Sequence, residues 1–160
     1  MLLERLLKFI RQEEKPVNAV LAGYFSKLVT LLINRKSKSL FPYIFGQSSD
    51  FVDCLLHHVY QKSLSELITK LLNISEETAR NASNEEVNVA ASVKERQAHI
   101  LNRLIEKLSP TASEEDNWNA AGILQDSLET KDFYAVVSKR HNVARLLDFA
   151  LPEAEASFDS

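Results

Sequence analysis

The sequence is poor in the residues that interrupt helices. Its 160 residues include only 3 glycines and 4 prolines, whereas leucine and isoleucine occur in nearly every segment. Folds with many short strands need glycine and proline for the backbone geometry of their tight turns. The shortage therefore disfavours β-sandwiches and doubly wound folds, and it predicts an all-α protein with a single sizeable core.

Cysteine and long apolar runs are scarce too. Because Cys54 is the only cysteine, no disulfide can form within the chain, which excludes a disulfide-stabilised secreted scaffold. The longest strongly apolar run, Leu28–Ile33, is far shorter than the roughly 20 residues that a membrane span requires. The first residues also lack the basic head and apolar stretch of a signal peptide. We therefore expect a cytoplasmic protein that does not insert in a membrane.

A strong excess of positive charge is absent as well. The formal net charge is −3, with 45% hydrophobic and 26% charged residues, which is an ordinary globular balance. Residues 1–80 carry 11 basic and 8 acidic side chains, and residues 81–160 carry 8 and 14. Proteins that bind along a nucleic-acid duplex normally have a strong basic surplus, so we expect no nucleic-acid partner.

The sequence is rich in apolar residues at helical spacing, in segments separated by proline or polar clusters. Asn18 and Ser63 are suitable N-cap residues, and Ser63 forms a capping-box pattern with Glu66. Residues 113–116 (Ser-Glu-Glu-Asp) open a later helix with acids at its positive end. Residues 73–88 are expected to be a polar connection with one weak helical turn. We expect seven or eight helices, over residues 2–15, 19–34, 51–60, 64–72, 89–108, 114–128, 132–137 and 142–151.

Two of these helices have clear apolar stripes. In residues 19–34 the expected buried stripe is Val20, Leu21, Tyr24, Leu28, Leu31 and Leu32, and a second stripe consists of the small residues Ala19, Gly23, Ser26 and Thr30. Glycine within a helix costs about 0.8–1 kcal/mol relative to alanine, so we expect a neighbouring helix close to the small stripe. In residues 114–128 the expected buried stripe is Trp118, Ala121, Leu124 and Leu128.

A weak internal repeat bears on how the helices are arranged. Residues 67–73 (Leu-Ile-Thr-Lys-Leu-Leu-Asn) echo residues 28–34 (Leu-Val-Thr-Leu-Leu-Ile-Asn) at a spacing of 39 residues. Such a spacing is typical of helix-pair repeats. We therefore expect a right-handed HEAT/armadillo-like helical repeat over residues 1–151, with a helix bundle as the alternative, followed by an acidic tail at residues 152–160.

The sequence offers little chemistry. His57 and His58 are adjacent and point about 100° apart on a helix, and Cys54 with His58 supplies only two metal ligands where zinc needs three or four. Paired acids occur only at helix ends or in connections, and no glycine-rich phosphate loop is present. We therefore expect no cofactor, no metal and no catalysis, and we rank an unrecognised helical active site as the weakest hypothesis.

Two surface features remain. Residues 34–38 (Asn-Arg-Lys-Ser-Lys) form a basic helix end that suits an acidic partner, or that merely complements the helix dipole. Residues 41–45 (Phe-Pro-Tyr-Ile-Phe) are dense in aromatics, which anchor interfaces or fill a core. For these aromatics the core is the favoured interpretation.

Several segments together resemble a known family. Residues 18–27 (Asn-Ala-Val-Leu-Ala-Gly-Tyr-Phe-Ser-Lys) lead on to Asn-Arg-Lys at 34–36, and Asp50-Phe51-Val52-Asp53 is followed by Leu55-Leu56 and His58. Residues 101–106 (Leu-Asn-Arg-Leu-Ile-Glu), an acidic stretch after Pro110, and Asn119-Ala120 follow in order. This pattern resembles the SAPS domain of protein phosphatase 6 regulatory subunits, whose members are usually several times longer.

The resemblance implies a non-catalytic scaffold that binds the catalytic subunit of a protein phosphatase 6-type Ser/Thr phosphatase, with further scaffold proteins as additional partners. Charged groups at helix ends and starts are expected to share one rim of a helical repeat. We therefore predict partner contacts at Asn34, Arg35, Lys36, Asp50 and Asp53. The alternative is a helical adaptor for a peptide or another scaffold, which an exposed groove lined by Phe41, Tyr43 or Trp118 would favour.

Overall fold

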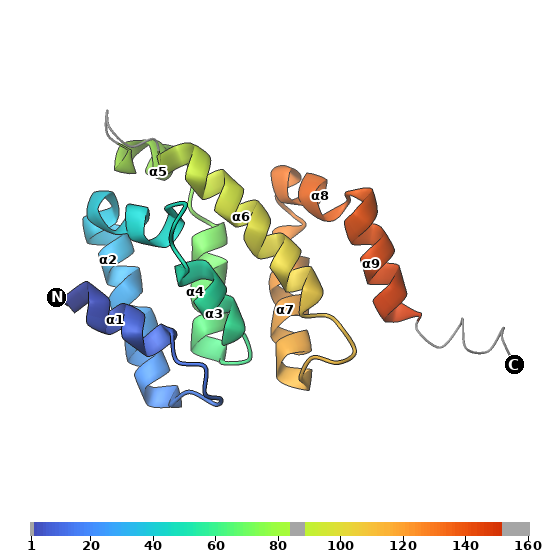
Figure 1. The fold of residues 1–160 in the computed structure, drawn as a ribbon. Helices are drawn as coiled ribbons and strands as arrows, with labels where there is room; N and C mark the ends of the chain where they lie inside the picture. The colour runs from blue at the N-terminus through green and yellow to red at the C-terminus, as the bar shows by residue number, and fades with distance from the viewer. Residues whose placement is uncertain (1, 84–88, 152–160) are drawn as a thin grey trace, which may run out of the picture.

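The computed structural model describes residues 2–83 and 89–151, and the predicted acidic tail at 152–160 lies outside the described residues. Within these ranges the chain is all-α, without strands (Figure 1). The helices are α1 (Leu2–Ile10), α2 (Ala19–Phe45), α3 (Phe51–His57), α4 (Lys62–Leu72), α5 (Glu76–Ala82), α6 (Val89–Glu106), α7 (Glu114–Ser127), α8 (Lys131–Val137) and α9 (Arg140–Ala150).

One of these nine described helices, α5, is longer than the single weak helical turn predicted within residues 73–88. The predicted polar connection contains two helical turns, because the Ser75 hydroxyl accepts a hydrogen bond from the Thr78 N–H at 3.1 Å and caps the helix. Ala79 and Ala82 are its buried residues. Alanine has the highest helix propensity but a weak apolar signal, so periodicity did not reveal the length of this helix.

Some predicted helix ends also differ. The first helix ends at Ile10 instead of continuing toward residue 15. Asn18 caps α2 as predicted, since its side-chain oxygen accepts from the N–H groups of Val20 and Leu21. The predicted Ser63 cap is wrong, because Gln61 occupies the N-cap position of α4 and accepts from the Ser63 N–H.

The helices form two layers. Figure 1 shows α2, α4 and α7 side by side in one row, all running in the same direction, and α4 contacts both of the others. The other layer contains α1, α3 and α6, which contact each other in that order, while α8 and α9 pack on α6. Their shared core is lined by leucine, isoleucine and phenylalanine side chains that lie between the layers. The predicted helical-repeat architecture is confirmed.

The 39-residue repeat relates two helices of the same row. The face that α4 presents to α2 includes Ser63 and Lys70, whose ammonium donates to the Thr30 hydroxyl at 3.2 Å. A methyl group added at Gly23 would lie 3.9 Å from the Ser63 hydroxyl oxygen. Helix α4 therefore packs against the predicted small-residue stripe of α2, and the space beside Gly23 can hold one methyl group.

Helix α2 bends where the sequence predicted its end. Lys36 has the non-helical dihedral angles φ −137° and ψ 35°, after which the helix resumes through Pro42. Phe41, Ile44 and Phe45 are buried, and the rings of Phe41 and Phe45 meet edge to face at 5.3 Å. The aromatic segment is therefore mainly core, as predicted, with Tyr43 left exposed.

A buried histidine joins the starts of α2 and α4. His58 Nε2 lies 2.6 Å from the Gln12 carbonyl oxygen, so this nitrogen must donate and Nδ1 must accept from the Tyr60 hydroxyl at 3.0 Å. The same hydroxyl accepts from the Val17 N–H at 2.9 Å. Burial lowers the pKa of His58, which favours this neutral arrangement.

Candidate protein-binding surfaces

Most of the apolar stripe that was predicted to be the core side of α2 faces solvent instead, whereas Leu28 is half-buried and Leu32 packs against the core. Tyr24 is 64% exposed, and Val20, Leu21 and Leu31 are each at least half exposed. The core contacts come from the opposite side of the helix, which carries Ala22, Phe25, Ser26 and Val29. The prediction failed because α2 is apolar on two faces, and α2 stands at the end of its row with a neighbour on one side only (Figure 1).

The exposed stripe continues into predicted partner residues. Successive helical turns carry Val20, Tyr24, Leu28, Leu31 and Arg35 on one side, and we call these five residues the α2 outer face. Asn34 lies beside Arg35, and both side chains are exposed. Helix α2 contains four basic residues and no acidic residue. The outer face is therefore apolar with a basic end.

The predicted acidic residues lie in the other layer and are already paired. The Arg11 guanidinium donates to both carboxylate oxygens of Asp50 at 2.9 Å, and this contact lowers the pKa of Asp50. His99 Nε2 lies 2.7 Å from an Asp53 carboxylate oxygen. Within the described ranges no hydrogen bond or ion pair joins these acids to residues 34–36. Sequence reasoning missed both pairs, because their members are 39 and 46 residues apart.

At the other end of the row, α7 has an exposed face that is acidic, whereas the exposed face of α2 has a basic end. Trp118 is 81% exposed and Leu128 is also exposed, so the predicted buried stripe of α7 is wrong except for Leu124. Ala120, Ile123, Leu124 and Ser127 face the core instead. Successive turns on the solvent side carry Glu114, Trp118, Gly122 and Gln125, and Glu129 follows two residues after the end of the helix. We call these five residues the α7 outer face. Helix α7 contains four acidic residues and no basic residue.

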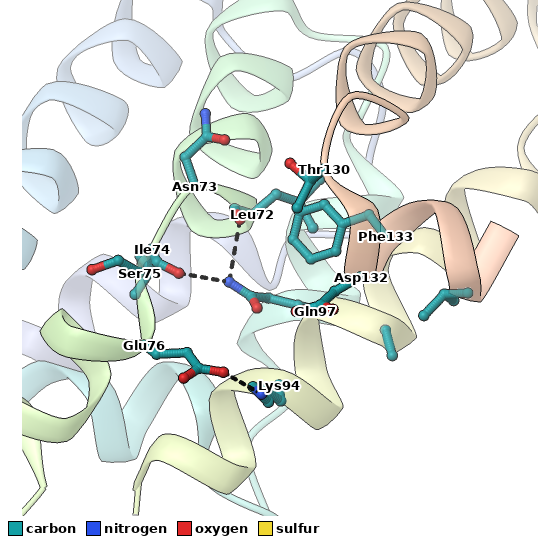
Figure 2. A pocket seen from close by; sticks show the side chains of 12 residues that line it. Leu72, Asn73, Ile74, Ser75, Glu76, Lys94, Gln97, Thr130, Asp132 and Phe133 are labelled. Atoms are coloured by element: carbon teal, nitrogen blue, oxygen red, sulfur yellow. Dashed lines mark hydrogen bonds and ion pairs between the residues drawn. The ribbon is translucent and has the colours of Figure 1, made fainter.

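A groove of about 440 Å³ lies between the α4–α5 turn, α6 and α8. Figure 2 shows the Gln97 amide aimed at the carbonyl oxygens of Leu72 and Ile74, to which it donates at 3.3 and 3.1 Å. The Glu76 carboxylate pairs with the Lys94 ammonium, which lowers the pKa of Glu76. These groups are engaged with each other, so the arrangement fastens the end of α4 to α6.

The metal-ligating side chains of the described residues are dispersed. These residues contain no group of three or more His, Cys, Asp or Glu side chains placed to hold a metal ion. Burial, with a further contribution from Asp50, raises the pKa of the Cys54 thiol to about 11. The thiol is therefore protonated at neutral pH, which does not suit a nucleophile. Over the same residues no helix is long and apolar enough to cross a bilayer.

Comparison with known proteins identifies relatives. The chain is 31% identical to human serine/threonine-protein phosphatase 6 regulatory subunit 1 over 91% of its own length and 17% of that protein. The chicken regulatory subunit 3 is 28% identical, again over 91% of this chain and 17% of the relative. The chain is homologous to the regulatory subunits of protein phosphatase 6. This confirms the family resemblance that residues 18–36 and 50–58 carry in the sequence.

The homology to protein phosphatase 6 regulatory subunits concerns a small part of those proteins, since the chain spans less than a fifth of their length. The human regulatory subunit 2 matches over a shorter region, at 27% identity over 78% of this chain. No protein-family model matches the chain. No solved structure matches it either.

Proposed function

We propose that the chain is a non-catalytic, cytoplasmic regulatory module that binds the catalytic subunit of a protein phosphatase 6-type Ser/Thr phosphatase. The observation that carries this proposal is the homology to phosphatase 6 regulatory subunits over 91% of the chain. In such a complex the catalytic partner performs the hydrolysis.

The basic end of α2 is the proposed docking point. Arg35 and Lys36 are exposed at the bend, and among the described residues neither side chain belongs to an ion pair. They are therefore available to an acidic surface, with Asn34 beside them. Asp50 and Asp53 have partners in Arg11 and His99, so we assign them a smaller contribution at the edge of the contact.

Charge reversal tests this docking point. The Arg35→Glu/Lys36→Glu variant should bind the purified catalytic subunit about tenfold more weakly, which corresponds to about 1.4 kcal/mol. The Lys62→Glu/Lys131→Glu variant changes the net charge equally at two exposed positions elsewhere and should bind normally. Isothermal titration calorimetry measures both. Absence of wild-type binding at about 50 μM catalytic subunit would overturn the proposed function.

A second candidate function has one observation in its favour. Tyr43 is exposed and lines an apolar groove of about 300 Å³ between α1 and α2, together with Leu3, Leu6 and Lys36. Such a groove suits an adaptor that binds an apolar peptide with an acidic residue next to Lys36. Under this alternative, Tyr43→Ser abolishes peptide binding and the catalytic subunit does not bind the wild-type chain.

A further inference from the structure

We infer that a second copy of this chain stacks head to tail on the first, with its α2 outer face against the α7 outer face of the first copy. The contact would continue the row α2, α4, α7 with the α2 of the next copy. This inference goes beyond phosphatase binding and rests on different side chains, apart from Arg35. Three observations support it: the internal repeat, the shapes of the two faces and their charges.

The repeat shows what kind of partner the α2 outer face fits. A shift of 39 residues places Ser63 at the position of Tyr24 and Lys70 at the position of Leu31. Ser63 and Lys70 lie on the side of α4 that packs against α2. By the repeat, the α2 outer face therefore corresponds to the side of α4 that packs against the preceding helix of the row. In the described structure Tyr24 and Leu31 on this face are exposed to solvent.

The α7 outer face has the features of a receiving surface. Within the chain, α4 lies on the small residues of α2, among them Gly23 and Thr30. Helix α7 likewise exposes two adjacent small residues one turn after Trp118: Gly122 on the outer face and Ala121 beside that face. A methyl group added at Gly122 would meet no atom within 4 Å. Large side chains such as Tyr24 and Leu31 of another copy can therefore approach α7 closely.

Charge favours this pairing over a symmetric one. Lys27 and Arg35 flank the apolar residues of α2, which has no acid, whereas Glu114 and Glu129 flank Trp118 on α7, which has no base. Two α2 faces would bring like charges together, and so would two α7 faces. Helices α2 and α7 lie at opposite ends of the row (Figure 1), so one copy can use both faces. Such a contact does not close on itself and generates linear chains.

Sedimentation velocity provides the test. Because one helix pair forms a small interface, association should appear as the concentration of the wild-type chain rises from about 10 μM to about 1 mM. Tyr24→Asp breaks the α2 outer face, and Gly122→Lys places a bulky cation on the α7 outer face. Both variants should stay monomeric over the whole range. Tyr134→Asp, at a similarly exposed tyrosine on α8, should associate like the wild type.

Folding is checked separately. Gly122→Lys replaces a solvent-facing glycine in a helix, so its melting temperature should equal or exceed that of the wild type. Leu31→Asp serves as a second α2 variant if Tyr24→Asp is misfolded by circular dichroism. Loss of association together with an unchanged melting temperature assigns the effect to the interface.

Mixing the two variants decides the geometry. Tyr24→Asp retains an intact α7 face and Gly122→Lys retains an intact α2 face, so an equimolar mixture should form dimers and nothing larger. A wild-type chain that stays monomeric up to about 1 mM overturns the inference. So does a mixture that fails to form dimers, or association that only one of the two substitutions abolishes, since a symmetric contact gives that result. Catalytic-subunit binding by the Tyr24→Asp variant separates this inference from the proposed function.

Discussion

Helices α2 and α4 are related by the internal repeat, yet one aligned face differs between them: it carries Tyr24 and Leu31 in α2, and Ser63 and Lys70 in α4. In α4, Leu64, Leu67 and Leu71 are fully buried, because the helix lies between α2 and α7. In α2, Tyr24 and Leu31 face solvent, because the helix has a row neighbour on one side only. The repeat aligns Leu64, Leu67 and Leu71 with Phe25, Leu28 and Leu32, and it aligns Tyr24 and Leu31 with Ser63 and Lys70. The comparison therefore shows that α2 carries additional apolar side chains on a face that has no row neighbour.

The largest expected effect separates the two helices directly. Leu67→Ala should lower the free energy of unfolding by about 2–5 kcal/mol, because it leaves a cavity in the core. Leu31→Ala removes the same side-chain atoms from an exposed position and should change stability by no more than about 0.5 kcal/mol. Urea denaturation of monomeric protein at low concentration measures both. Equal effects would contradict the assigned environments.

The next largest effect on stability concerns the C-terminal end of α4, where a buried glutamine from α6 binds the last carbonyl oxygens. Gln97 is buried and donates to the carbonyl oxygens of Leu71, Leu72 and Ile74. Gln97→Leu keeps a similar volume but leaves these acceptors without a donor, and it should cost about 1–3 kcal/mol. Gln125→Leu on the α7 outer face is the matched control and should be nearly neutral in the same denaturation experiment.

How much of this was predictable depends on the range of the interaction. Asn18 caps its helix as predicted, because capping involves neighbouring residues. The exposed face of α2 was not predictable, since a helix that is apolar on two sides does not reveal which side has a neighbour. The pairs that hold Asp50 and Asp53 depend on tertiary contact with α1 and α6, and no local spacing rule contains them.

A pH-dependent effect is expected where the starts of α2 and α4 are joined. Burial lowers the pKa of His58; the hydrogen bond to the Gln12 carbonyl oxygen opposes this, and His57, Lys15 and Lys107 add smaller lowering contributions. The unfolded chain, whose histidines titrate near about 6.5, then binds more protons than the folded chain. Stability due to His58 is therefore present above neutral pH and declines as pH falls from about 7.5 to about 5.5.

Urea midpoints at several pH values measure this decline. His58→Gln retains a donor for the Gln12 carbonyl oxygen and does not titrate. Its stability should therefore vary less with pH than that of the wild type over this window. Asp50, whose pKa is lowered by Arg11, affects stability only in the more acidic range, so it does not confound the comparison. An identical pH dependence in both proteins would show that His58 protonates equally well in the folded chain.

The smallest expected effect on stability comes from replacing the two helical glycines, and it tests how closely a neighbouring helix approaches each of them. Gly23 faces α4 and Gly122 faces solvent, and both lie inside helices. Replacing either with alanine should raise the free energy of unfolding by up to about 1 kcal/mol, because alanine has the higher helix propensity. At Gly23 this requires that the new methyl group fits beside Ser63, and the 3.9 Å separation is an ordinary van der Waals contact. Stabilisation by Gly122→Ala with destabilisation by Gly23→Ala would mean that α4 lies closer to α2 than described. If both substitutions raise the free energy of unfolding equally, and their effects add in the double variant, then α4 leaves space for a methyl group beside position 23. The contact between α2 and α4 would then not require glycine at this position.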